Sequence, residues 1–168
     1  GSVWSKTALD LAEPFDLKME LGFGDRDALG ADGVVFVLAP SADTGWRGEG
    51  LGYAGLRRSL GIELDTYQNR RQGDPSADHL ALVAHGYVSH RYGGVVELPN
   101  LEDGRRHPFR VTWAPGGDGL SVYLDGVRRA TYPAAMVQKL VGEDGSVAWG
   151  LTAGTGRKSN AHEVCFDS

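Results

Sequence analysis

The feature that most constrains the fold is a strict alternation of apolar and polar residues between positions 14 and 23. Successive side chains of a strand point to opposite faces of a sheet, so this pattern predicts a half-buried β-strand. One predicted face is apolar throughout and holds Phe15, Leu17, Met19, Leu21 and Phe23; the other holds Asp16, Lys18, Glu20 and Gly22. The apolar face needs a second layer to cover it.

The rest of the chain repeats this theme in short segments separated by turn signals. The apolar run from 33 to 39 stops at Pro40 and predicts a strand covered on both faces. Asp125-Gly126 is a strong hairpin signal, and the 25 glycines supply the tight turns of an all-β chain. Further strands are predicted at 62–67, 80–88, 95–98, 109–113, 120–124, 127–132, 147–151 and 164–167, and a short helix only at 133–141. We therefore predict an all-β fold with two antiparallel sheets packed as a sandwich.

Composition narrows the class of protein. A chain of 168 residues can form a single domain with a substantial core, and no run is long and apolar enough to insert into a membrane. The net charge is −5 and the arginine pairs are scattered, which argues against binding to nucleic acid. Cys165 is the sole cysteine, so an internal disulfide is excluded. We expect residues 1–168 to be one domain excised from a longer protein.

Carboxylates, an amide and a histidine gather between residues 61 and 79. Glu63 and Asp65 share one face of the predicted strand, Asn69 and Asp74 follow in a polar loop, and His79 opens the next apolar run. Carboxylates buried this close repel unless a cation neutralises them. The oxygens of Asp65, Asn69 and Asp74, with a backbone carbonyl, suit Ca²⁺. A transition ion such as Mn²⁺ also accepts imidazole, which suits a set made of Glu63, Asp65, Asp74 and His79.

The competing interpretation of this stretch is a solvated acidic turn, because Gly-Asp and Asp-Pro are common turn pairs. Such a turn does not need Glu63 inside a strand or His79 at the start of the next one. A metal site explains both residues.

The order Ile-Glu-Leu-Asp-Thr-Tyr-Gln-Asn, then Asp-Pro-Ser, then His resembles the metal-binding segment of the legume (L-type) lectins, the concanavalin A-like family. The resemblance implies an antiparallel jelly-roll β-sandwich. It also implies that Glu63, Asp65, Asp74 and His79 hold a transition metal, and that Asp65, the Tyr67 carbonyl, Asn69 and Asp74 hold calcium. Ser89 falls where the family has a serine that holds a metal-bound water. The expected cofactors are Ca²⁺ and Mn²⁺ or another transition ion.

The same resemblance implies a set of sugar-binding residues. Ala31-Asp32-Gly33 matches the family tripeptide whose aspartate accepts hydrogen bonds from two sugar hydroxyls and whose Ala-Asp bond is cis, so Asp32 takes that role. In the glycine-rich segment 48–53, Gly50 is the residue whose backbone N–H meets the sugar. Asn69 gives its amide N–H to the sugar, and Tyr67 offers a ring to the apolar face of a pyranose.

The segment 151–164 resembles the last sugar-binding loop of the family. By that resemblance Arg157 and Lys158 tune the choice of monosaccharide, although their positive charge departs from the plant proteins. The composition, rich in Arg, Ala and Gly, hints at a bacterial source.

The leading functional interpretation is a metal-dependent, non-catalytic carbohydrate-binding module that is extracellular or on the cell surface. Its expected partners are glycans or glycoconjugates, and a homodimer is allowed. One alternative is a jelly-roll glucanase, since Glu63 and Asp65 begin a Glu-x-Asp-x-x-Glu pattern, but position 68 is glutamine. The other is a laminin-G-like adhesion module, against which His79 argues because such a module needs calcium alone.

Overall fold

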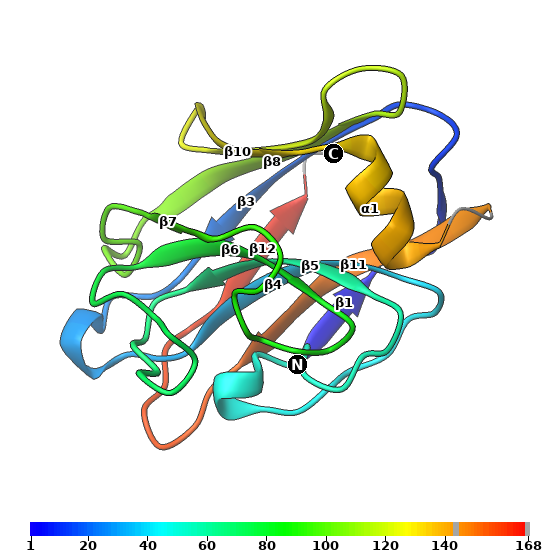
Figure 1. The fold of residues 1–168 in the computed structure, drawn as a ribbon. Helices are drawn as coiled ribbons and strands as arrows, with labels where there is room; N and C mark the ends of the chain where they lie inside the picture. The colour runs from blue at the N-terminus through cyan, green and yellow to red at the C-terminus, as the bar shows by residue number, and fades with distance from the viewer. Residues whose placement is uncertain (143–144, 167–168) are drawn as a thin grey trace.

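The computed structural model describes residues 1–142 and 145–166, which form two packed antiparallel sheets (Figure 1). The seven-stranded sheet has the order β1 (Ser2–Trp4), β11 (Ser146–Gly154), β4 (Gly33–Ala39), β5 (Leu60–Asp65), β6 (His79–Ala84) and β7 (Val95–Glu97), with β2 (Leu9–Asp10) paired to β11. The five-stranded sheet has the order β10 (Val127–Tyr132), β9 (Gly119–Leu124), β8 (Arg106–Ala114), β3 (Phe15–Gly22) and β12 (Glu163–Phe166). The predicted antiparallel sandwich is confirmed.

The alternation between residues 14 and 23 produces β3, whose buried residues face the other sheet. Met19 and Leu21 are almost fully buried, and β3 pairs along its whole length with β8. The inner faces of the two sheets meet in one apolar core, to which Phe36, Ile62 and Phe109 contribute. Burial of such side chains contributes about 1.5–3 kcal/mol each relative to exposure.

The predicted covering of β4 on both faces is also confirmed. Its outward side chains Val35 and Val37 are fully buried under the loop that follows the strand, where they pack with Leu51, Tyr53 and Leu56. This second apolar cluster lies on the outer face of the seven-stranded sheet. The loop 46–58 thereby covers the face on which the side chains of Glu63 and Asp65 also project.

Helix α1 (Ala134–Val141) confirms the helix predicted at 133–141. It lies at one end of the two sheets (Figure 1). Pro133 precedes its first residue, where the missing backbone N–H has no helical partner to lose. Val137, Leu140 and Val141 are buried and join the main core. The helix therefore closes the core at that end.

Some predicted boundaries were wrong. The strand expected to run from 80 to 88 ends at Ala84, because His85 and Gly86 both adopt positive φ and turn the chain. The short strands β1 and β2 were not predicted individually, and neither were the 3-10 turns η1 (Asp27–Leu29) and η2 (Gly48–Gly50). The last strand was expected to reach Asp167, which lies outside the described residues.

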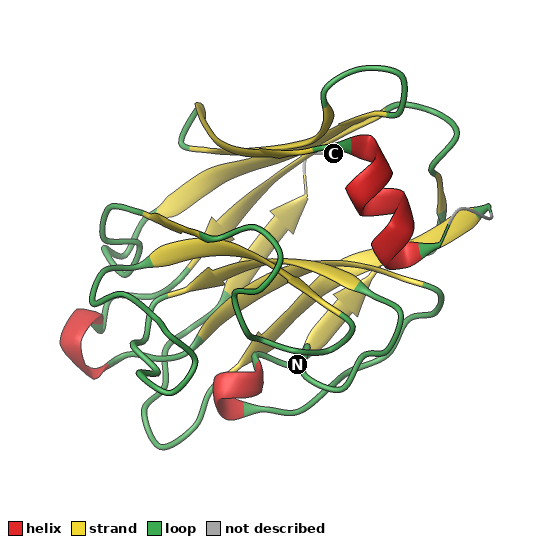
Figure 2. Cartoon of the chain, in the orientation of Figure 1, coloured by secondary structure: helices red, strands yellow, loops and turns green. Residues whose placement is uncertain are grey.

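Long loops connect the strands, and Figure 2 shows several of them in green at the side of the molecule away from α1. None of the helices in the described ranges has the length and apolarity to cross a bilayer.

Candidate functional site

The predicted metal-binding segment is built on the β5–β6 hairpin. Asp65 lies directly opposite His79 in the ladder, and Glu63 lies opposite Ala81, so all of their side chains project from the outer face of the sheet. The strand ends at Asp65, two residues earlier than predicted. Asp65 Oδ1 accepts a hydrogen bond of 2.7 Å from the Tyr67 backbone N–H, and this contact starts the loop.

The loop 66–78 folds back so that Asp74 lies close to β5 and β6. Asp74 Oδ2 accepts a 2.6 Å hydrogen bond from the Asn69 backbone N–H, and its carbonyl accepts one of 3.3 Å from the Gln68 side chain. Asp74 Oδ1 lies 3.8 Å from His79 Nε2. Asp65, Asp74 and His79 each have one ligand atom within 4.8 Å of those of the other two. The structure therefore brings these predicted metal ligands together.

A histidine that the sequence did not single out completes a second group. Ligand atoms of Glu63, His79 and His90 also lie within 4.8 Å of one another. The turn at His85-Gly86 sends the chain back over the outer face and delivers residues 89 and 90 to the site. Ser89, the predicted holder of a metal-bound water, directly precedes His90 in the chain, and its Oγ is buried without a hydrogen bond among the described residues.

Burial gives this set of side chains unusual electrostatics. Glu63 and Asp65 are each 2 % exposed, and burial raises the pKa of both carboxyl groups, with Glu63 adding to the rise at Asp65. Burial also raises the pKa of Asp74 and lowers that of His79 to about 4, so His79 stays neutral. Charged carboxylates without a partner are costly here, and a divalent cation would remove that cost. The residues therefore fit a metal ion.

This burial leads to a prediction for the metal-free protein. A carboxyl group with a raised pKa in the folded state costs stability above that pKa, and the cost disappears as the pH falls towards its ordinary value. With chelator present, Asp65→Asn should therefore be more stable than wild type at pH 8, by about 1–3 kcal/mol. Asparagine Oδ1 can still accept the Tyr67 N–H.

The advantage should shrink as the pH falls to about 4, which is close to the ordinary pKa of an aspartate. Thermal melts in chelator between pH 4 and 8 measure it. The exposed Asp118 supplies a matched control, since Asp118→Asn should show no such trend. A constant difference between wild type and Asp65→Asn across the pH range would contradict the burial argument.

The calcium ligands predicted from the resemblance lie in the same loop. Tyr67 and Asn69 are partly exposed, and both are tied by their backbone N–H groups to the metal carboxylates Asp65 and Asp74. The structure thus places the predicted calcium ligands around the two shared aspartates. Their roles remain predictions.

Asp32 lies just before β4, and the predicted cis Ala31-Asp32 bond is confirmed. Its backbone carbonyl accepts hydrogen bonds from Thr66, from the backbone N–H at 2.8 Å and from Oγ1 at 3.1 Å. Its carboxylate Oδ2 is buried and makes no hydrogen bond in the described chain. Burial, followed by the charge of Glu49, raises the pKa of Asp32 to about 6. Asp32 therefore has unused acceptor capacity next to the end of β5, which carries predicted metal ligands.

Two glycine-containing loops meet at Asp32. A Cβ added to Gly156 would lie 3.8 Å from Asp32 Oδ2 and 3.8 Å from the Gly48 Cα. Gly50, the predicted backbone donor, is buried in turn η2, and its carbonyl accepts hydrogen bonds from Tyr53 and Ala54. Gly48 of this turn and Asp32 therefore both lie close to Gly156.

The predicted residues of the last loop reach the same region. Lys158 Nζ lies 5.0 Å from the centroid of the Tyr67 ring and donates a 3.0 Å hydrogen bond to the Ala28 carbonyl. Arg157 is exposed in this loop. The structure therefore brings Lys158 and Tyr67 together, and a sugar that stacks on this ring would have a cationic neighbour.

An ion pair that the sequence did not reveal joins two of these loops. The Arg71 guanidinium pairs with the Glu49 carboxylate, and its Nε lies 2.8 Å from Glu49 Oε2. Arg71 belongs to the metal-binding loop and Glu49 to turn η2. This contact links the loop that carries the metal ligands to the glycine-rich turn.

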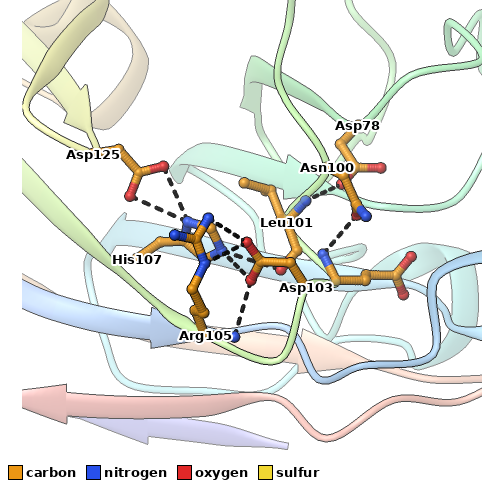
Figure 3. A network of polar contacts seen from close by, with 8 residues as sticks. Asp78, Asn100, Leu101, Asp103, Arg105, His107 and Asp125 are labelled. Atoms are coloured by element: carbon orange, nitrogen blue, oxygen red, sulfur yellow. Dashed lines mark hydrogen bonds and ion pairs between the residues drawn. The ribbon is translucent and has the colours of Figure 1, made fainter.

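A polar network centred on the buried His107 lies at the connection between β7 and β8 and reaches Asp78 (Figure 3). Asp78, the residue before His79, accepts a 2.7 Å hydrogen bond from the Leu101 backbone N–H through Oδ2. The His107 ring lies between Asp125, 3.0 Å from Nδ1, and Asp103, 3.2 Å from Nε2. These contacts fix the segment 98–107 against the start of β6.

The same segment also anchors the last loop. Asn160 Nδ2 donates a 2.7 Å hydrogen bond to Glu102 Oε1, and Glu102 is 3 % exposed. One connection between β7 and β8 therefore contacts both Asp78, which precedes the predicted ligand His79, and the loop of Arg157 and Lys158. The spacing of residues in the sequence did not predict these contacts of the β7–β8 connection.

The geometry does not suit the glucanase alternative. A hydrolase needs two carboxyl groups that reach the scissile bond of a bound glycan. Glu63 and Asp65 are almost fully buried, and Gln68 hydrogen-bonds to the Asp74 carbonyl.

Known structures share this fold. Lectin II from Ulex europaeus superposes with a TM-score of 0.77 at 18% identity, over 96% of this chain and 76% of that chain. Basic winged bean lectin, solved with Tn-antigen, gives 0.71 at 20% identity over 96% and 75%. Peanut lectin, solved with a 9mer peptide, gives 0.70 at 22% identity over 98% and 73%. At these identities the similarity concerns the fold.

At the level of sequence, the pesticidal crystal protein Cry22Aa of Bacillus thuringiensis is 37% identical over 71 residues, which cover 41% of this chain. The match spans only 10% of the length of that protein. A family model described as the legume lectin beta-barrel domain matches residues 1–168. Because that match covers the whole chain, the protein belongs to the legume (L-type) lectin domain family, whose members are carbohydrate-binding lectins and not enzymes.

Proposed function

We propose that this domain binds glycans or glycoconjugates at a surface site organised by Ca²⁺ and by Mn²⁺ or another transition ion. The observation that carries the proposal is the position of Asp32. Its carboxylate has a buried oxygen without a hydrogen bond, and its backbone is bonded to Thr66, the residue next to Asp65. The carboxylate suited to accepting hydrogen bonds from sugar hydroxyls thus belongs to a residue that is hydrogen-bonded to the end of the proposed metal-binding strand.

The sugar-contacting groups in this proposal are a carboxylate, an amide, a backbone N–H and a ring. Asp32 accepts hydrogen bonds from two hydroxyls, and Asn69 donates its side-chain N–H. A backbone N–H of turn η2, predicted at Gly50, meets the sugar where a bulky side chain would obstruct it. The Tyr67 ring supports the apolar face of the pyranose. Hydrogen bonds to a charged group are worth about 1.5–3 kcal/mol each, which makes Asp32 the main contributor.

The metal ligands have a structural role in this proposal. Glu63, Asp65, Asp74 and His79 would hold the transition ion, and Asp65 and Asp74 would share the calcium with Asn69 and the Tyr67 carbonyl. Bound ions would neutralise the buried carboxylates and fix the loop 66–78. Asn69 and Tyr67 then stay in place relative to Asp32.

Arg157 and Lys158 are proposed to set the choice of sugar. Lys158 lies over the Tyr67 ring, so its position decides which substituents a stacked pyranose can carry. Cationic groups at this place favour sugars that carry acidic groups nearby. We also propose an extracellular or cell-surface location, where calcium is abundant enough for modest-affinity sites.

A glycan array tests the proposal. We expect binding to a defined subset of glycans, abolished by an excess of the matching free monosaccharide. The release of reducing ends from a glucan panel should stay at the level of the blank. Binding to protein ligands that free sugar leaves unchanged would instead support an adhesion module, and the absence of any glycan ligand would contradict the proposal.

A further inference from the structure

His90 lies among the transition-metal ligands at contact distance. Its Nε2 is 3.4 Å from Glu63 Oε2 and 3.6 Å from Asp74 Oδ1. Its ring meets the His79 ring edge to face, with the centroids 5.2 Å apart. The side chain is 8 % exposed, so it is directed into the protein and not into solvent.

The polar atoms that converge here have no other partner. Neither nitrogen of His90 forms a hydrogen bond within the described residues, and the same holds for His79 Nε2 and Glu63 Oε2. Unsatisfied buried polar atoms are rare in proteins, because each costs about 1–3 kcal/mol. Three of these atoms, His90 Nε2, His79 Nε2 and Glu63 Oε2, come from the three side chains whose ligand atoms converge, and they indicate a missing common partner.

The spacing fits one ion at that point. Ligand atoms that bind a transition ion at about 2.0–2.2 Å lie about 3–4 Å from one another. The separations between His90 and Glu63, His90 and Asp74, and His79 and Asp74 are 3.4, 3.6 and 3.8 Å. His90 is therefore as well placed to bind the ion as His79.

We propose that His90 is a direct ligand of the transition ion, and that this second imidazole makes the site favour a borderline ion such as Zn²⁺ over Mn²⁺. Imidazole suits Zn²⁺, whereas Mn²⁺ is typically held by oxygen ligands. A site with two histidines thus gains more affinity for Zn²⁺ than for Mn²⁺. The inference rests on the proposed function, since it concerns the same metal site, and it assigns to His90 a role that Ser89 and a water were predicted to fill.

The first test locates the ion. Crystals of the wild-type protein grown with Zn²⁺ and Ca²⁺, with anomalous scattering measured at the zinc edge, should place Zn²⁺ about 2.0–2.1 Å from His90 Nε2. A zinc ion held by Glu63 and His79 with His90 beyond bonding distance would overturn the proposal. This measurement does not depend on the folding of any variant.

The second test measures selectivity. His90→Asn should weaken Zn²⁺ binding by about 10- to 100-fold and Mn²⁺ binding by less than about fivefold, because only zinc gains strongly from the imidazole. The affinities come from competition with a chromophoric chelator at constant Ca²⁺. His85 provides the matched control: it lies in the same loop but outside the ligand groups, and asparagine tolerates its positive φ.

The outcomes separate this inference from the proposed function. Equal losses of Zn²⁺ and Mn²⁺ in His90→Asn would overturn the preference for Zn²⁺, and no loss of either would overturn the role of His90 as a ligand, while the metal-dependent lectin stands in both cases. A wild-type protein that binds neither ion would overturn both. His85→Asn should match wild type for both ions.

Discussion

Asp32→Asn should abolish measurable sugar binding while metal content and fold stay intact. The substitution keeps the shape of the side chain but removes its charge and half of its acceptor capacity. Two charge-assisted hydrogen bonds are worth about 1.5–3 kcal/mol each, so an affinity loss of about 100-fold or more is expected. The variant should be no less stable than wild type at pH 7. Burial raises the pKa of Asp32 to about 6, so its ionised form costs stability above that pH.

Titration calorimetry with a glycan ligand identified on the array measures this loss, with metal content determined on the same samples. Asp27→Asn is the matched control, because Asp27 is an exposed aspartate in the neighbouring turn η1. It should bind the ligand as wild type does. Wild-type affinity in Asp32→Asn would show that another group reads the sugar hydroxyls.

Removal of the metal ions should lower the melting temperature and the sugar affinity together. Glu63, Asp65 and Asp74 bring three carboxylates into a buried space, and two divalent ions would bring four positive charges to it. An ion at about 100 times its dissociation constant stabilises the folded state by about 2.7 kcal/mol. In a domain of this size that corresponds to a fall of roughly 5–10 °C on removal. The loop 66–78 should loosen as well and displace Asn69 and Tyr67.

Thermal melts and sugar titrations, each with and without chelator, measure both effects. Calcium added together with the transition ion should restore the melting temperature and the affinity. Magnesium alone should not, because it prefers strict octahedral oxygen sites and sheds its waters reluctantly. Unchanged melting and unchanged sugar affinity after verified metal removal would mean that the ions do not organise the site.

Local sequence patterns predicted the parts of this fold that depend on local rules. Alternation placed β3 and its buried face, because the period of a strand is two. The same rule placed Glu63 and Asp65 on one face of β5, with a polar loop after the strand and His79 at the start of the next apolar run. The register of that hairpin sets Asp65 opposite His79. Neighbouring strands therefore bring together ligands that are fourteen positions apart.

The parts that were missed depend on where chain turns send distant segments. His90 reaches the predicted metal ligands because residues 85 and 86 adopt left-handed conformations and turn the chain. The apolar run up to Val88 had instead predicted a strand that continues through these two residues. The Glu49–Arg71 pair joins two loops whose approach is set by tertiary packing. The network around His107 likewise joins residues from separate turns. No periodicity encodes such contacts, so only the folded arrangement reveals them.

The position of Lys158 over the Tyr67 ring has a practical consequence for attaching this domain to surfaces or dyes. The chain has four lysines, Lys6, Lys18, Lys139 and Lys158. Amine-directed coupling that modifies Lys158 therefore places the attached group beside the ring proposed to hold the pyranose, and a biosensor coupled at this residue blocks part of its own recognition surface. The lone thiol of Cys165 belongs to β12, in the five-stranded sheet, whereas β5 and β6, which carry the proposed metal ligands, belong to the other sheet. Thiol-directed coupling thus offers an orientation that leaves the lysine amine and the tyrosine ring free.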